Sequence, residues 1–242
     1  MSERFPAPDG YRRLELPRGH FGRWSRGLPV LPGRGQVLLF DGRPKARQSA
    51  QAAVLDVDVG RRDLQQCADL AIRLHAEHLR ALGRAPCFRF TSGHRARWTD
   101  WAAGARPQIR GSRVRWQPDA AAPSESYASF RGYLRTVFSY AGTASLHRDS
   151  RPIAWADAEP GDVFVEPGFP GHLVIVLDVA AKDDERLLLL AQSYMPAQSP
   201  HVLRGPIDGA WYPKPTGPLE TPEWHFETPR PRRLELGCGS PS

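Results

Sequence analysis

Residues 161–199, GDVFVEPGFPGHLVIVLDVAAKDDERLLLLAQSYMPAQS, decide the fold of this chain. Two apolar runs, Leu173–Val179 and Leu187–Ala191, are rich in leucine and β-branched residues, and the charged turn KDDE lies between them. Short apolar runs around a polar turn are typical of the two strands of a buried β-hairpin. His172 precedes the first run and Gln192 follows the second. Because hairpin strands are antiparallel, we expect these two residues at the same end of the hairpin.

The sequence upstream, DLQQCADLAIRLHAEHLRALG at residues 63–83, predicts the main helix. Asp63 is a suitable N-cap, Gln66 completes a capping-box-like pair, and Gly83 is a natural stop. The inward face of this helix is predicted to contain Leu64, Cys67, Ala68, Ala71 and Leu74. A second helix is predicted at Ser124–Tyr140, where aromatic residues share one face.

Shorter patterns complete an α+β fold in which an antiparallel sheet packs on the capped helix. Strands are predicted at Val37–Phe40, Ala53–Val59, Cys87–Thr91, Ser112–Trp116 and 161–165. Residues 1–35 are rich in Pro, Gly and Arg and predict an irregular N-terminal arm. Residues 205–242 hold eight prolines together with Trp211 and Trp224, and predict an extended segment packed on the domain. Residues 36–204 are therefore expected to form a single α+β domain.

The composition of the 242 residues limits the classes of function. The net charge is +7, but 30 of the 33 basic residues are arginines scattered along the chain, and we expect no nucleic-acid partner. No apolar run approaches the roughly 18 residues of a membrane span. The N-terminus lacks the apolar core of a secretory signal, which by default predicts a cytoplasmic protein, although processing of a longer precursor stays open. Three cysteines, Cys67, Cys87 and Cys238, allow at most one disulfide.

Cys67 is the candidate nucleophile. It lies in the first turns of the predicted helix, where the helix dipole lowers the pKa of a thiol. A cysteine near a helix start, a histidine at a strand edge and a polar residue on the next strand form the site of papain-like hydrolases. We therefore predict Cys67 as nucleophile, His172 as general base and Gln192 as the group that orients the imidazole. Gln66, directly before the cysteine, is a fourth candidate, for holding the oxyanion.

The strand GDVFV at 161–165, followed by GH and an apolar run, resembles a segment of NlpC-type and CHAP-type cysteine peptidases and amidases. The similarity covers residues 63–75 and 161–193. It implies a papain-like, NlpC-like architecture and cofactor-free hydrolysis of a peptide-like or glycan-peptide substrate. In those families the nucleophile occupies the very first turn of its helix. Here Cys67 falls a few residues inside the predicted helix, and the segment from Cys67 to His172 is longer.

A larger part of the chain, residues 37–226, resembles a bacterial family of unknown function. The matching segments are DLQQCAD at 63–69, Trp98 with Trp101 and Gly104, YAGT at 140–143, GDVF at 161–164, GHLVIVLD at 171–178, QSYMPAQ at 192–198 and TPEW at 221–224. This resemblance implies no particular activity. It implies that the Cys67 helix and the loop after Gln192 belong to one shared architecture.

Other interpretations stay open, because a small cysteine on the inward face of a helix is also typical of a core residue. The same fold would then be a non-catalytic module that binds a glycan or a peptide, or a structural module with no small-molecule site. The predicted binding residues are Ser193, Tyr194, Gln198, Trp98 and Trp101. His75 and His78 lie three residues apart on the helix, but we expect a solvated face there and no metal or other cofactor. The oligomeric state stays open.

Overall fold

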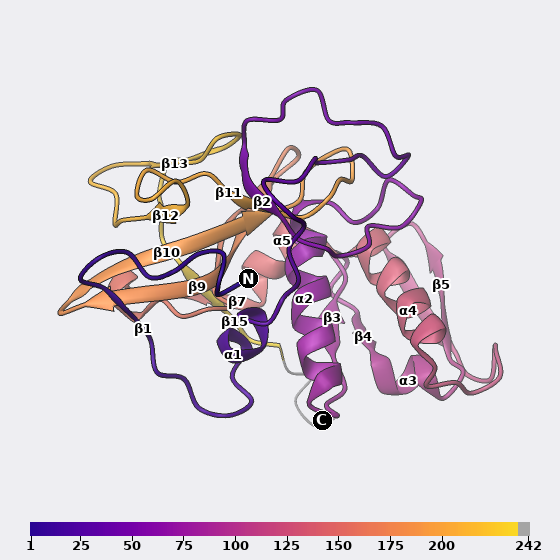
Figure 1. Cartoon of the computed structure of the whole chain (residues 1–242). Helices are drawn as coiled ribbons and strands as arrows, with labels where there is room; N and C mark the ends of the chain where they lie inside the picture. Colours follow the sequence, from indigo (N-terminus) through magenta and orange to yellow (C-terminus); the bar gives the residue numbers. More distant parts are fainter. Residues whose placement is uncertain (237–242) are drawn as a thin grey trace.

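A long β-hairpin, β9 (His172–Lys182) and β10 (Glu185–Gln192), forms the centre of the main sheet (Figure 1). In the computed structural model, which describes residues 1–236, Leu188 pairs with Val179, and the chain reverses at Asp183 with a φ of 49°. Aspartate tolerates this left-handed conformation better than most residues. The predicted hairpin is therefore present, and its strands extend beyond the two apolar runs.

The sheet around this hairpin is antiparallel throughout. Within residues 1–236, nine strands form it in the order β2-β11-β10-β9-β8-β15-β7, with β1 paired to β9 and β12 to β10. The other strands of this sheet are β1 (Arg12–Arg13), β2 (Gln51–Val54), β7 (Ser150–Pro152), β8 (Val163–Glu166), β11 (His201–Leu203), β12 (Trp211–Tyr212) and β15 (Arg232–Leu234). Separate two-stranded sheets are formed by β3 (Cys87–Arg89) with β4 (Arg95–Arg97), β5 (Arg106–Arg110) with β6 (Arg113–Gln117), and β13 (Leu219–Glu220) with β14 (His225–Phe226).

The helices lie mainly on one face of the sheet. They are α1 (Phe21–Ser25), α2 (Cys67–Ala81), α3 (Trp98–Ala102), α4 (Tyr127–Tyr140) and α5 (Thr143–Arg148), with a 3-10 turn at Trp155–Asp157. Leu173 and Ile175 of β9 share one buried cluster with α2, whereas Val174 and Val176 belong to a second cluster on the opposite face. Because successive side chains of a strand point to opposite faces of the sheet, β9 contributes to both buried clusters. The α+β class predicted from the sequence is confirmed, and Figure 1 shows α2 between the sheet and α4.

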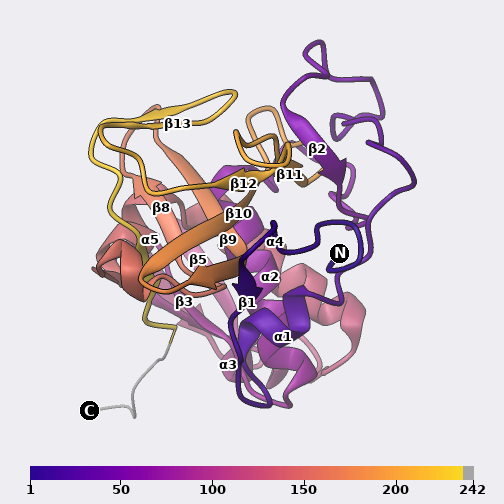
Figure 2. The same cartoon turned by 60° about the vertical axis from the view of Figure 1, so that its left-hand side comes forward.

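The N-terminal residues 1–35 are more ordered than the irregular arm that the sequence predicts. They contain β1 and α1 (Figure 2). They also contribute Phe5 to the main core. Asp178, in the middle of β9, is fully buried, and Arg13 and Arg26 reach its carboxylate at 2.6 and 2.9 Å. A buried carboxylate needs charged partners, and the N-terminal segment supplies both. Local composition could not reveal this long-range pairing.

Two of the predicted early strands were placed wrongly. Val37–Phe40 forms only isolated bridges, one of them from Leu39 to Gln198, and Ala53–Val59 is replaced by the shorter β2. The segment near residue 39 contacts the loop after β10 rather than another strand, so its residues do not form a ladder of paired backbone hydrogen bonds. Helix α5 and strand β5 were not predicted from the sequence, because they are too short to show hydrophobic periodicity.

Trp211 is expected to be one of the most costly residues to remove from the C-terminal part. Its side chain is 1% exposed, and its Nε1–H donates to the carbonyl of Pro6 at 3.1 Å, which links the C-terminal part to the N-terminal segment. Trp211→Ala should lower the free energy of unfolding by about 3–5 kcal/mol, measured by urea denaturation. Phe169→Ala is the matched control, because Phe169 is 94% exposed. A loss for Trp211→Ala as small as that of the control would contradict this role.

Candidate active site

Cys67 is the first residue of α2, not a residue several positions inside it. The predicted cap, Asp63, is used differently: its Oδ1 accepts from Gln66 Nε2 at 2.9 Å and from the N–H of Ala197 at 2.6 Å. The N-cap is Gln66, whose N–H donates to the carboxylate of Asp69 at 3.0 Å. The thiol therefore occupies the helix terminus rather than a position inside the helix, whereas the long segment between Cys67 and His172 remains.

The thiol of Cys67 lies against the start of β9. Its Sγ is 4.0 Å from the carbonyl oxygen of Gly171, and the N–H of Leu173 also faces the sulfur. The sulfur is thus beside the backbone on both sides of His172. The side chain is 8% exposed. Burial, followed by the charge of Asp69, raises the pKa of the thiol to about 11, which corrects the lowered pKa expected from the helix dipole alone.

His172 is the first residue of β9 and is 1% exposed. Its Nε2 lies 2.9 Å from Oε1 of Gln192, the last residue of β10, so the hairpin brings the two together as the sequence predicts. The rings of Tyr194 and Trp224 cover the imidazole at centroid distances of 4.8 and 5.0 Å. Burial lowers the pKa of His172 to about 4, so the imidazole is neutral at pH 7.

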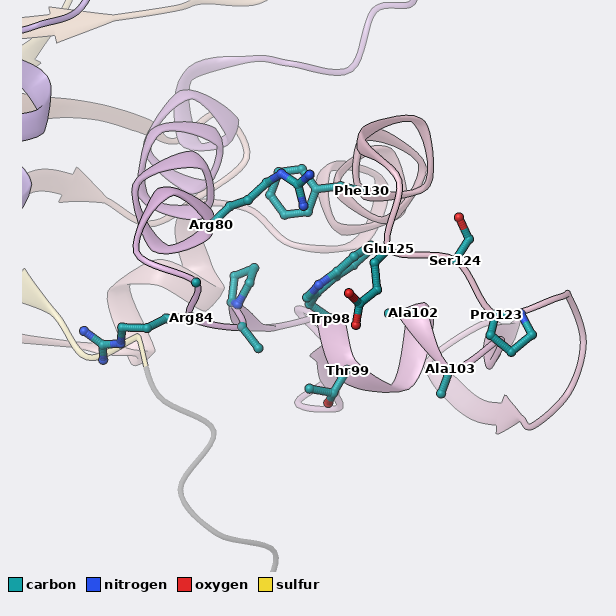
Figure 3. A pocket seen from close by; sticks show the side chains of 13 residues that line it. Arg80, Arg84, Trp98, Thr99, Ala102, Ala103, Pro123, Ser124, Glu125 and Phe130 are labelled. Carbon is teal, nitrogen blue, oxygen red and sulfur yellow. The ribbon is translucent and has the colours of Figure 1, made fainter.

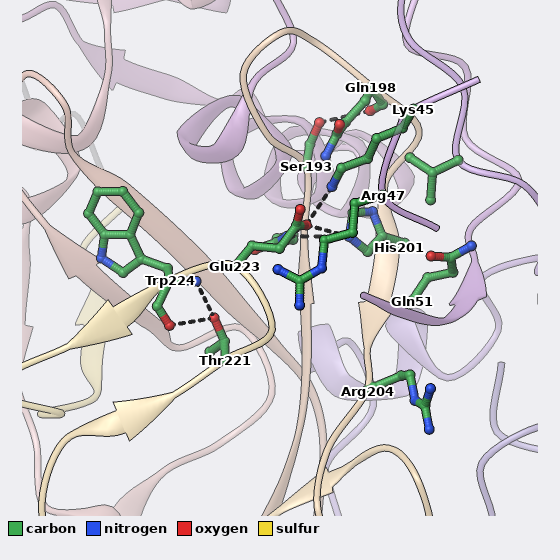
Figure 4. A network of polar contacts seen from close by, with 12 residues as sticks. Lys45, Arg47, Gln51, Ser193, Gln198, His201, Arg204, Thr221, Glu223 and Trp224 are labelled. Carbon is green, nitrogen blue, oxygen red and sulfur yellow. Dashed lines mark hydrogen bonds and ion pairs between the residues drawn. The ribbon is translucent and has the colours of Figure 1, made fainter. Parts of the chain in front are cut away.

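Gln192 is held by a charged network that the sequence analysis missed (Figure 4). One oxygen of Glu223, Oε2, lies 2.7 Å from Gln192 Nε2 and 2.5 Å from Lys45 Nζ, and it is 3.7 Å from Nε2 of His201. Figure 4 shows Lys45, Glu223 and His201 converging at this point. Burial alone raises the pKa of Glu223, but hydrogen bonds from His201 and Lys45 outweigh it and lower the pKa to about 2.

The negative charge of Glu223 determines the orientation of the Gln192 amide. A carboxylate only accepts hydrogen bonds, so the NH2 group of Gln192 must point to Glu223 and its carbonyl oxygen to His172. His172 must then carry its proton on Nε2 to donate to that oxygen. The lone pair of Nδ1 is left available as a base. The network therefore selects the tautomer of His172 that is protonated on Nε2.

The loop after Gln192 is tied to the start of α2. Ser193 Oγ lies 3.1 Å from the carbonyl oxygen of Gln65 and 2.8 Å from that of Gln198, so its single hydroxyl proton bonds to one or is shared between the two. Both Ser193 and Gln198 are buried. These predicted binding residues therefore hold the loop in place. Tyr194 differs, because it is only partly buried and its ring lies beside the imidazole of His172. Burial raises the pKa of the Tyr194 phenol, and the charges of Glu223 and Cys67 raise it further.

Trp98 and Trp101 are not brought to this site. Trp98 lines a cavity of about 600 Å³ at the C-terminal end of α2, together with Arg80, Arg84 and Phe130 (Figure 3). Trp101 packs beside it under the guanidinium of Arg106, 3.9 Å from the ring centroid. Cys67 is at the opposite end of α2, so these two predicted binding residues do not share a site with the loop after Gln192.

The predicted solvated face at His75 and His78 is also wrong. Their Nε2 atoms each lie 2.9 Å from a carbonyl oxygen, of Gly161 and of Gly19 respectively. Phe21 packs against both rings. Among residues 1–236, no group of three or more His, Cys, Asp or Glu side chains is arranged to hold a metal ion.

Comparison with protein families finds a match that spans residues 1–233 and is described as domain of unknown function 4846. The chain belongs to this family. The match includes the Cys67 helix, the hairpin, the loop after Gln192 and Glu223, so all the residues of the candidate site lie within domain of unknown function 4846. No curated protein and no solved structure matches the chain significantly. Within residues 1–236, no helix is long and apolar enough to cross a membrane.

The buried imidazole predicts a defined loss of stability in acid. The unfolded chain protonates His172 near its ordinary pKa of 6.5, whereas the folded protein resists protonation until about pH 4. The free energy of unfolding should therefore fall as the pH is lowered from 6.5 to 4, by about 3 kcal/mol from this residue. Urea denaturation across this range checks the slope. His172→Gln should reduce the slope; identical slopes for the two proteins would contradict the assignment.

Proposed function

We propose that this protein is a cofactor-free cysteine hydrolase that cleaves an amide or peptide-like bond, with Cys67 as nucleophile and His172 as general base. The observation that carries the proposal is the fixed hydrogen bond between His172 Nε2 and Gln192 Oε1, with the Cys67 sulfur beside the backbone of His172. This order of groups is that of a papain-like site, in which a polar residue orients the imidazole and leaves Nδ1 for the thiol.

The pKa values indicate how the reaction would begin. Thiol and imidazole are both neutral at pH 7, since burial raises the pKa of Cys67 to about 11 and lowers that of His172 to about 4. Nδ1 of His172 would take the thiol proton as the sulfur attacks the carbonyl carbon. The first N–H groups of α2 would stabilise the oxyanion. Gln66 is a weaker candidate for this role, because its amide already donates to Asp63.

The remaining steps follow from the same two residues. The imidazolium returns its proton to the leaving amine as the carbon–nitrogen bond breaks, which leaves an acyl thioester on Cys67. Neutral His172 then takes a proton from water as the water oxygen attacks the thioester carbon. The carbon–sulfur bond breaks, the carboxylic acid leaves, and the imidazolium returns its proton to the sulfur, which regenerates the thiol. No cofactor is needed for these steps.

A second candidate function is the non-catalytic binding of a peptide or glycan. It is favoured by the 8% exposure of Cys67 and by the raised pKa of its thiol, which are ordinary for a core cysteine. Tyr194, which is partly exposed beside the imidazole, would then provide a contact for the ligand.

Alkylation of the native protein separates the two functions. Iodoacetamide should modify Cys67 at pH 7.5 in the folded protein, with the site identified by peptide mass spectrometry. Cys67→Ser is the matched control, and circular dichroism confirms that the fold persists. Labelling that occurs only in urea would show that Cys67 is a core thiol. This result would contradict the hydrolase proposal and favour the non-catalytic binding function. The unlabelled wild-type protein should also cleave a peptide pool that Cys67→Ser leaves intact, and alkylation of Cys67 should abolish this cleavage.

A further inference from the structure

A second cavity, of about 490 Å³, lies next to the candidate active site, between the end of α4, the start of α5 and the β5–β6 hairpin. Its apolar walls are Ile109, Val114, Tyr140, Ala141, Ala144 and Phe169. The remaining lining residues are glycine, serine and threonine, so no charged side chain lines it. In a chain with a net charge of +7, this uncharged lining favours an uncharged occupant. The volume is within the ordinary range of ligand pockets.

Gly171 connects this cavity to the thiol. Thr143, which lines the cavity, lies so close to Gly171 that a Cβ there would meet its Oγ1 at 2.6 Å. The carbonyl oxygen of Gly171 is in turn 4.0 Å from Cys67 Sγ. A single residue therefore separates the wall of the cavity from the sulfur. A substrate bound with its carbonyl at Cys67 would place a neighbouring side chain within reach of the cavity.

Phe169 is the second observation that points to a ligand. It is 94% exposed, although it is a large aromatic residue at the cavity edge, in the loop directly before His172. Exposed apolar groups beside a pocket commonly mark a site that is covered when a ligand binds. Tyr140, at the end of α4, also lines the cavity and is 42% exposed. The two rings would cover the flanks of an apolar group.

We propose that this cavity is a specificity subsite for an uncharged, apolar or aromatic side chain of the substrate. This assignment rests on the proposed hydrolase function, because it concerns the substrate of that reaction. The substrate is thus a peptide-like molecule, and the aromatic or large aliphatic side chain beside its scissile bond occupies the cavity.

Direct binding tests this subsite without catalysis. The probes are N-acetyl-phenylalaninamide and N-acetyl-glycinamide, titrated by NMR into the full chain carrying Cys67→Ala. The phenylalanine amide should bind about tenfold more tightly, because the cavity removes its ring from water. Ala144→Phe fills the cavity and should abolish the preference, and Phe169→Ser should reduce it.

Leu82→Ser is the matched control, since Leu82 is an exposed apolar residue at the far end of α2, and it should leave the preference unchanged. Equal affinities for the two amides, or a preference that survives Ala144→Phe, would overturn the subsite. All of these proteins lack Cys67, so the binding experiment does not depend on the hydrolase proposal. That proposal is tested separately, by alkylation of the wild-type thiol. Phe169→Ser changes an exposed residue, so its result does not depend on repacking.

Discussion

Replacing His172 by alanine should slow alkylation of Cys67 at pH 7.5 by about a hundredfold, within the range that a positioned general base contributes. At pH 7.5 a thiol with a pKa of about 11 is almost entirely protonated, so its reactivity depends on the neutral imidazole. Above pH 11 the thiolate forms without help. The rates of wild type and His172→Ala should therefore converge there, as measured by mass spectrometry of samples quenched over time.

His94→Ala is the matched control for this experiment, because His94 is exposed and its ring bonds only to Ser92 in the described residues. It should leave the rate unchanged at every pH. A wild-type rate that follows a simple titration near pH 11, with no difference in His172→Ala, would show that the imidazole does not act on the thiol. The dependence on pH distinguishes a base from a residue that merely supports the fold.

The buried ion pair under Gln192 predicts the second large effect. The side chains of Lys45 and Glu223 are only 12% and 10% exposed, so removing either charge leaves the other buried without its partner. Glu223→Gln should lower the free energy of unfolding by about 3–5 kcal/mol, and Lys45→Met by a similar amount. The double variant should lose much less than the sum of the two, because no unpaired charge remains. Urea denaturation of the four proteins measures this coupling.

The same variants separate stability from chemistry. Lys45→Met keeps the Glu223 carboxylate, so Gln192 stays oriented and alkylation of Cys67 at pH 7.5 should be nearly unchanged. Glu223→Gln replaces the carboxylate, which can only accept hydrogen bonds, by an amide that can also donate them. The Gln192 amide can then turn and no longer fixes the tautomer of His172, which should slow alkylation of Cys67. For comparison, Glu235→Gln breaks the exposed contact with Arg151 and should change neither quantity measurably. Equal alkylation rates in Lys45→Met and Glu223→Gln would contradict the orienting role of Glu223.

The candidate site illustrates which contacts can be inferred without a structure. His172 and Gln192 meet because they end two strands of a hairpin that is visible in the sequence. Glu223 lies 31 residues from Gln192 and 178 from Lys45, and nothing in its local sequence names either partner. The segment TPEW around Glu223 stands out as a motif, but its place under Gln192 follows only from the path of the C-terminal part.

Local patterns determined the hairpin, the main helix and the order Cys67, His172 and Gln192, because apolar periodicity and turn residues act over neighbouring positions. Only the tertiary structure decided that the helix starts at Cys67, since Asp63 bonds to Ala197 in a distant loop instead of capping. It also decided that the thiol is buried with a raised pKa. Burial and ion pairing depend on which segments meet in space, and that is a property of the whole chain.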